Sequence, residues 1–195
     1  MNLLERRLDL LVRHIDKLRE AVRATKRDRP FHIDAWVVLP DHMHTIWTLP
    51  PDDDDFSNRW KSIKIRFVQK LPRTERRSKV RVAKGERGIW QRRYWEHRVR
   101  DERDYANHVA YIHYNPVKHG YVSRVIDWPY SSFHRHVRSG RLDNPVSWVT
   151  RNPVSWVICR LVVRDEPQHK QSHTQHKRCN NHTLTGYRLS SMGLE

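Results

Sequence analysis

The stretch AWVVLPDHMHTIWTLP, residues 35–50, contains two apolar runs separated by a proline and an aspartate, with two histidines opening the second run. Pro40 presets the dihedral angle of a turn, and Asp41 can bond to the backbone just beyond it. The pattern predicts a β-hairpin with strands over residues 31–39 and 42–49. We expect the first strand to present its odd-numbered residues to one face.

The same alternation places His42 and His44 side by side on one face of the second strand. They lie about 7 Å apart along the strand, so their imidazoles can close on one divalent ion as neighbouring ligands. An isolated His-x-His pair is more often two partly buried histidines bonded to backbone or water. Other residues must decide between these interpretations.

The charge of the chain points to a polyanionic partner. Among 195 residues, 38 Lys and Arg face 22 Asp and Glu, which gives a net charge of +16 and an isoelectric point near 10.4. Between residues 59 and 103 there are 17 basic and 5 acidic residues. Aromatic residues are interleaved there, as in proteins that stack nucleic-acid bases beside neutralised phosphates. The alternative is a solvated basic surface.

The basic segment supplies the candidate phosphate contacts. It opens with an expected helix whose apolar residues recur at helical steps from 60 to 71, preceded by the acidic run 52–55, which suits a helix N-terminus. Residues 72–87 are predicted to form a flexible basic loop. The residues expected to bind the phosphates of such a partner are Arg59, Lys61, Lys64, Arg92 and Arg93.

Two further helices are expected. Leucine and other aliphatic residues recur at helical spacing from 4 to 22, and Pro30 ends that segment. Asp101 is the expected N-cap of a helix that ends at Asn115 and Pro116, because a residue before proline is displaced from the helical region. Tyr111 and Asn115, one turn apart, can point in the same direction. A tyrosine in such a place is usually structural.

Taken together, these motifs resemble the REP-associated tyrosine transposases, a branch of the single-tyrosine HUH endonucleases related to insertion-sequence transposases. The resemblance extends over residues 28–138. It rests on the segments RPFHIDAWVVLPDHMHTIWTLP, IWQRRYWEHRVRDERDYANHVAYIHYNPVKHGYV and DWPYSSFHRHV, which occur in the family's order.

The resemblance implies metal-dependent nicking and rejoining of single-stranded DNA at hairpins of repetitive extragenic palindromes. It implies that His42, His44 and Asn115 bind Mg²⁺ or Mn²⁺. Tyr111 would attack the phosphodiester, giving a 5′-phosphotyrosyl link and a free 3′-OH. Tyr114 is the rival nucleophile, but it faces another direction and directly precedes Asn115.

The expected architecture is a single α+β domain of the HUH type over residues 1–143, an antiparallel sheet with helices on one face. The resemblance implies a strand before the first helix, and because this chain starts essentially on the expected helix, we expect it to lack that strand. Its absence is expected to leave unpaired backbone groups beside the histidine strand.

Residues 144–195 are expected to form a separate segment. The motif NPVSWV occurs twice, at 144–149 and 152–157, as in a local duplication, and the polar stretch beyond Arg164 is expected to be disordered. Zinc binding by that stretch is possible in principle but disfavoured, because the spacing of its ligand types is irregular: His169, His173, His176, Cys179 and His182.

Neither a signal peptide nor a membrane span is recognisable, so we expect a cytoplasmic bacterial protein. The oligomeric state is open, a monomer included. Two alternatives to the transposase remain: a catalytically inactive remnant that only binds hairpin DNA, and an RNA-binding module, since a basic aromatic surface does not exclude a 2′-OH.

Overall fold

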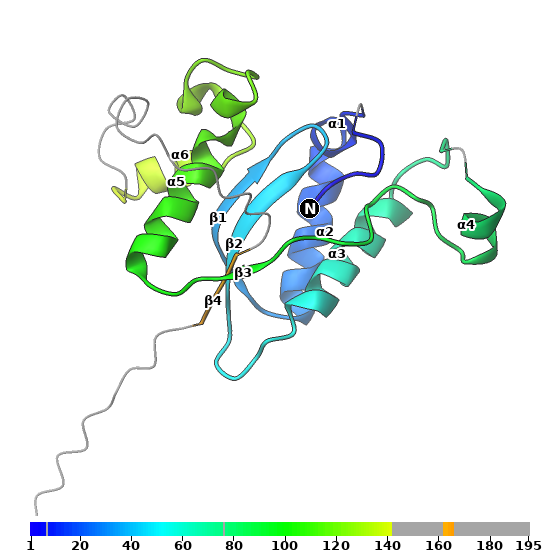
Figure 1. The fold of residues 1–195 in the computed structure, drawn as a ribbon, viewed down its shortest axis with the longest axis horizontal. Coiled ribbons are helices and arrows are strands. Elements are labelled where there is room, and N and C mark those ends of the chain that lie inside the picture. Colours follow the sequence, from blue (N-terminus) through cyan, green and yellow to red (C-terminus); the bar gives the residue numbers. More distant parts are fainter. Residues whose placement is uncertain (7, 76, 142–161, 166–195) are drawn as a thin grey trace, which may run out of the picture.

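A computed structural model describes residues 1–6, 8–75, 77–141 and 162–165 (Figure 1). Strands β1 (His32–Val38) and β2 (Met43–Leu49) form the predicted antiparallel hairpin. Two short strands, β4 (Val162–Asp165) and β3 (His97–Arg98), extend the sheet in the order β1-β2-β4-β3. Because β4 runs parallel to both of its neighbours, the sheet is mixed and not wholly antiparallel as expected.

Helices cover both faces of the sheet (Figure 1). One face packs on α1 (Leu10–Arg13), α2 (Ile15–Asp28) and α3 (Phe56–Gln69). The other packs on α5 (Glu102–Lys118) and the short helix η1 (Val125–Asp127), with α6 (Phe133–Arg138) beside them. The α+β class is therefore confirmed, but the expectation of helices on one face is wrong, because the hairpin buries apolar side chains on both sides.

A bulge in β1 explains why both faces are apolar. Ile33 pairs with Trp47 and Ala35 pairs with Ile46, so Asp34 is an extra residue in the ladder. Phe31 and Ile33 consequently pack toward α2 and α3, whereas Ala35 and the next odd-numbered residues pack toward α5. The prediction of a single face for all odd-numbered residues fails at this bulge.

The first residues of the chain pair with the start of β2 instead of beginning a helix. The backbone N–H of Met43 donates to the carbonyl of Met1 (2.9 Å), and that of Leu3 donates to the carbonyl of Asp41 (2.8 Å). On the other side, the Gln91 N–H donates to the carbonyl of Asn2 (3.0 Å). Residues 1–3 thus lie between β2 and residues 89–91. The expected unpaired backbone groups beside the histidine strand are therefore not found where residues 1–3 and β4 pair with it.

The acidic run 52–55 organises the start of α3. The Asp55 carboxylate accepts a hydrogen bond from the backbone N–H of Asn58 (3.2 Å) and so caps the helix. The following basic connection is not wholly a loop, because residues 79–83 form the exposed helix α4 (Lys79–Ala83), capped by Ser78. The guanidinium of Arg87, near the end of this connection, donates two hydrogen bonds to the carboxylate of Glu75, near its start (2.5 and 2.6 Å).

Both copies of NPVSWV, and the histidines and cysteine considered for zinc binding, lie outside the described residues. Strand β4, in contrast, belongs to the segment that the sequence analysis separated from the domain. It pairs with β2 over Ile46–Leu49. This part of the C-terminal segment therefore completes the sheet.

Candidate active site at the histidine strand

His42 and His44 lie on the α5 side of β2, as the alternation predicted. Their ring centroids are 5.1 Å apart with planes at 82°, and the two residues are 4% and 3% exposed. Burial of two imidazoles is costly unless their polar atoms are satisfied. The two histidines are therefore part of the buried interior and not a chance pair on the surface.

Asp41 fixes the orientation of His42. Its Oδ1 lies 2.6 Å from Nδ1 of His42, and its Oδ2 accepts a hydrogen bond from Nε of Arg6 (2.7 Å). Burial favours the protonated carboxyl group, but the hydrogen bonds from His42 and Arg6 outweigh it and hold the pKa of Asp41 well below its usual range. An ionised Asp41 places the proton of neutral His42 on Nδ1 and leaves the lone pair on Nε2, as in many metal-binding histidines.

Tyr111 comes from the middle of α5 and meets the histidine pair. Its ring contacts His44 edge-on, with centroids 5.5 Å apart at 88°, and the residue is only 7% exposed. The ammonium group of Lys118 lies over the ring of Tyr111, with Nζ 4.9 Å from the ring centroid and 3.5 Å from the phenolic oxygen. The sequence analysis did not single out Lys118, although its spacing of seven residues from Tyr111 places it on the same helix face.

Asn115 lies one turn beyond Tyr111 and is fully buried. Its Nδ2 donates to the carbonyl of Tyr111 (3.2 Å). Within the described ranges, no protein group hydrogen-bonds to its Oδ1. A buried amide oxygen without a donor is the kind of atom that a cation can satisfy.

Helix α5 does not end at Pro116 as predicted. It continues to Lys118, and the N–H of His119 still donates to the carbonyl of Asn115 (3.0 Å). Proline lacks only its own N–H, so the turn beyond it can stay helical where other bonds support it. Gly120, at φ +73°, then ends the helix in the left-handed region.

The extra turn brings a third histidine to the site. The ring of His119 lies 5.1 Å from that of His42 at 73°. Burial, followed by the electrostatic influence of His42 and Lys118, lowers the pKa of His119. His119 was missed because the helix was expected to stop at Asn115; the i, i+4 spacing from that residue is the signal that could have found it.

A groove of about 1010 Å³ opens on the other side of residues 1–3. It lies between α3 and residues 85–94, and Trp90 and Gln91 of its wall adjoin the segment that pairs with β2. Residues 89–91 of that wall therefore lie two chain spacings, roughly 10 Å, from the histidine strand. Basic and aromatic side chains line it together, among them Trp60, Lys61, Lys64, Arg92 and Tyr94.

Comparison with known proteins identifies the group. A family model described as "Transposase IS200 like" matches residues 2–115. A REP-associated tyrosine transposase of Escherichia coli K12 is 51% identical over 148 residues, covering 76% of this chain and 81% of the relative. A relative from Haemophilus influenzae is 47% identical over 136 residues, with coverages of 69% and 77%.

The chain belongs to the IS200-like transposase family. A solved structure described as the REP-associated tyrosine transposase bound to a REP hairpin superposes with a TM-score of 0.67 at 46% identity. The match covers 82% of this chain and 86% of that one. The resemblance to REP-associated tyrosine transposases is thus confirmed, as is the enzyme class, a transposase that acts as DNA endonuclease and strand transferase.

Within this transposase, the residues expected to bind DNA fall into two groups. Lys61 and Arg93 are exposed, and Arg92 is exposed but faces Glu86 (3.0 Å). Lys64 is partly buried, donates to the carbonyl of Gln91 (3.1 Å), and has its pKa lowered to about 8 by burial. These four remain candidates for contact with a phosphate backbone.

Arg59 differs from the other four. It is 2% exposed, and its guanidinium bonds to both carboxylate oxygens of Asp53 (2.9 and 2.6 Å) and to the carbonyl of Pro30 (2.8 Å). All of these partners are within the protein, so the guanidinium is not available to DNA. Contrary to the expectation, Arg59 therefore has a structural role. Its positive charge lies at the start of α3 and pairs with Asp53 of the acidic run that precedes this helix.

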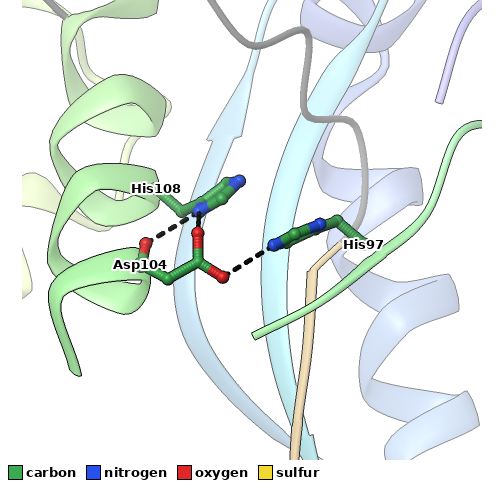
Figure 2. Close-up of side chains that lie close together, drawn as sticks. All are labelled: His97, Asp104 and His108. Atoms are coloured by element: carbon green, nitrogen blue, oxygen red, sulfur yellow. Dashed lines mark hydrogen bonds and ion pairs between the residues drawn. The ribbon is translucent and has the colours of Figure 1, made fainter. Parts of the chain in front are cut away.

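The transposase carries a second cluster of ligand-type residues (Figure 2). His97 of β3 and His108 of α5 flank Asp104, with His97 Nε2 2.7 Å from Oδ2 and His108 Nδ1 3.1 Å from Oδ1. The sequence analysis did not identify this cluster. In the described part of the chain, no helix is long and apolar enough to cross a membrane.

Proposed function

We propose that this transposase nicks and rejoins single-stranded DNA at REP-type hairpins through a 5′-phosphotyrosyl link to Tyr111. The observation that carries the proposal is the buried contact of Tyr111 with His44, next to the amide of Asn115. Tyr114 is only half-buried and projects from another side of α5. The proposal therefore assigns the nucleophile to Tyr111.

The residues present fit a divalent cation, Mg²⁺ or Mn²⁺. His42, His44 and Asn115 would bind it, and the unsatisfied Oδ1 of Asn115 supports this assignment. When bound, the ion polarises the scissile phosphate and stabilises the negative charge on its oxygens. All three ligands are neutral, so they do not repel the phosphate.

The reaction forms one bond and breaks another at the same phosphorus. The phenolic oxygen of Tyr111 attacks, its proton is lost, and the bond to the 3′ oxygen breaks as that oxygen takes up a proton. The 5′ phosphate stays on the tyrosine. Attack by a 3′-OH reverses the step, so strands can be joined without ATP. Lys118, 3.5 Å from the phenolic oxygen, would stabilise negative charge there.

The basic groove supplies a path for the strand. Of the residues that line it, Lys61, Lys64 and Arg92 would neutralise phosphates, while Trp60 and Tyr94 offer apolar walls. The exposed Arg93, next to Arg92 in the chain, would add a further cation outside the groove lining. The solved relative was bound to a REP hairpin, which supports hairpin DNA as the partner. Because the substrate is chromosomal DNA, we place the protein in the bacterial cytoplasm.

The decisive test uses a hairpin oligonucleotide labelled at its 3′ end, since the DNA on that side of the nick stays on the protein. Full-length chain is incubated with it and Mn²⁺, and the products are separated on a denaturing gel. We expect a labelled protein band from the wild type and from Tyr114→Phe, and none from Tyr111→Phe. Tyr114→Phe is the matched control, because it removes the same hydroxyl three residues away.

Three results would contradict the proposal. An adduct that persists in Tyr111→Phe and disappears in Tyr114→Phe would move the nucleophile. Hairpin DNA binding with no adduct in any variant would indicate the inactive remnant. Preferential competition by an RNA hairpin of the same sequence would favour the RNA-binding module.

A further inference from the structure

His97, Asp104 and His108 form a compact set of metal-ligand types away from the proposed catalytic residues (Figure 2). Their ligand atoms all lie within 4.8 Å of one another. The two imidazole rings stack on each other with centroids 4.8 Å apart at 20°. Asp104 lies between them, on the first turn of α5.

The burial of the cluster favours an inserted ion. The side chains of His97, Asp104 and His108 are 22%, 11% and 8% exposed. Nδ1 of His108 lies 2.7 Å from the backbone carbonyl of Asp104. With the proton on Nδ1, the lone pair of His108 is on Nε2, and in the described ranges that buried atom has no hydrogen-bond partner.

The distances fit neighbouring ligands of one ion. Ligands at about 2.0 to 2.2 Å from a metal lie roughly 3 to 3.5 Å from one another. Nε2 of His97 lies 2.7 Å from Oδ2 of Asp104, and one ligand atom from each of the three residues lies within 4.8 Å of the others, so a modest adjustment brings them to that geometry. Two imidazoles and one carboxylate are a donor set suited to Zn²⁺ and related first-row ions.

The cluster is separate from the histidine pair. His97 pairs with Val162 of β4, which pairs with Ile46 of β2, so His97 lies two strands, or roughly 10 Å, from β2. His108 precedes Tyr111 by three residues on α5. An ion at His108 would therefore act on the helix that carries Tyr111, without touching His42 or His44.

We infer that His97, Asp104 and His108 bind a second divalent transition-metal ion that ties β3 to the first turns of α5. The ion would displace the proton of the hydrogen bond between Asp104 and His97. Exposed Arg100, whose Nε is 3.6 Å from Oδ2 of Asp104, opposes it only weakly because solvent screens that charge. The role is structural: it fixes the position of the tyrosine-bearing helix.

The experiment measures Zn²⁺ stoichiometry by calorimetry on the full chain. To remove the first site, the background carries His42→Ala and His44→Ala. Adding His97→Gln is expected to remove one equivalent of Zn²⁺. The matched control is His32→Gln, because His32 also faces an aspartate (Asp34, 3.2 Å) but belongs to no three-residue cluster of ligand types among the described residues. Any zinc bound by the C-terminal histidines is unchanged by all of these substitutions.

A second measurement keeps the test independent of folding defects. In the same background, Zn²⁺ is expected to raise the melting temperature, and His97→Gln, at the most exposed of the three positions, is expected to abolish that rise. Equal stoichiometry with and without His97→Gln overturns the inference. A zinc-dependent rise in melting temperature that persists in the His97→Gln variant also overturns it, since the three residues would then be joined by hydrogen bonds alone.

Discussion

Asp41 shows how one carboxylate sets the behaviour of a neighbouring ligand. It is buried, accepts from Arg6, and contacts Nδ1 of His42. A histidine oriented in this way keeps its ring in position for binding through Nε2. The acidic residue of the turn, chosen by the sequence analysis for its turn chemistry, therefore also serves the adjacent histidine.

Replacing this carboxylate tests that role. We expect Asp41→Asn to weaken Mn²⁺ binding at the His42 site by about 10- to 100-fold, because the amide no longer stabilises the required tautomer. Mn²⁺ titration followed by electron paramagnetic resonance measures the affinity. Asp16→Asn, on the exposed surface of α2, is the control. Unchanged affinity in Asp41→Asn would show that the tautomer does not depend on Asp41.

Lys118 is the second informative residue. Its ammonium group lies over the ring of Tyr111 and 3.5 Å from the phenolic oxygen. We expect Lys118→Met to slow formation of the tyrosyl adduct by about tenfold to a hundredfold, because charge on the oxygen loses a nearby cation. Single-turnover kinetics measure the rate. Lys118→Arg should recover part of it, and equal rates for Met and wild type would exclude this role.

At the scale of elements, the start of α3 depends on a buried ion pair. Arg59 bonds to Asp53 and to the carbonyls of Pro30 and Asp55. We expect Asp53→Ala to lower the free energy of unfolding by about 2 to 3 kcal/mol, because the substitution leaves a buried guanidinium without its counter-ion. Since Asp53 is partly exposed, the effect is smaller than that of breaking a fully buried pair. Urea denaturation measures it, with Asp54→Ala as control.

The same pair predicts a dependence on acid. The hydrogen bond from Arg59 lowers the pKa of Asp53 to about 2, and that from Arg87 lowers the pKa of Glu75 to about 2. Depressed carboxyl pKa values stabilise the fold above the unfolded pKa, near 4, and this contribution is lost as pH falls toward 2. Stability should therefore drop between about pH 5 and 2, less steeply in Asp53→Asn. An unchanged slope in that variant would refute the assignment.

At the scale of the whole molecule, charge governs affinity for DNA. The net charge of +16 supplies a long-range attraction, while the proposed phosphate contacts come from individual cations such as Lys61 in the groove and the exposed Arg93. We expect Lys61→Ala with Arg93→Ala to weaken hairpin binding and to reduce the slope of log affinity against log salt by about 2, roughly one for each lost contact. Fluorescence anisotropy over a salt series measures the slope. Arg138→Ala on α6 should change it little, and an equal change there would indicate diffuse attraction alone.

The sequence by itself determined the features that depend on neighbours a few residues apart. Strand alternation set the hairpin and the shared face of the two histidines, and the Asp101 cap and helical spacing placed Tyr111 one turn before Asn115. These preferences are local, so short-range periodicity and turn chemistry are enough to predict them.

The tertiary structure decided what depends on partners distant in the chain. The bulge at Asp34, the hydrogen bond of Arg59 to the carbonyl of Pro30, and the pairing of residues 1–3 with β2 all join segments that no local pattern connects. His97 and His108 likewise come together from two different elements, β3 and α5. Helix α5 also continues beyond Pro116 to Lys118, and this extra length places His119 beside His42. Local preferences of about 1 kcal/mol per residue cannot specify such contacts, because burial and pairing in the folded chain outweigh them.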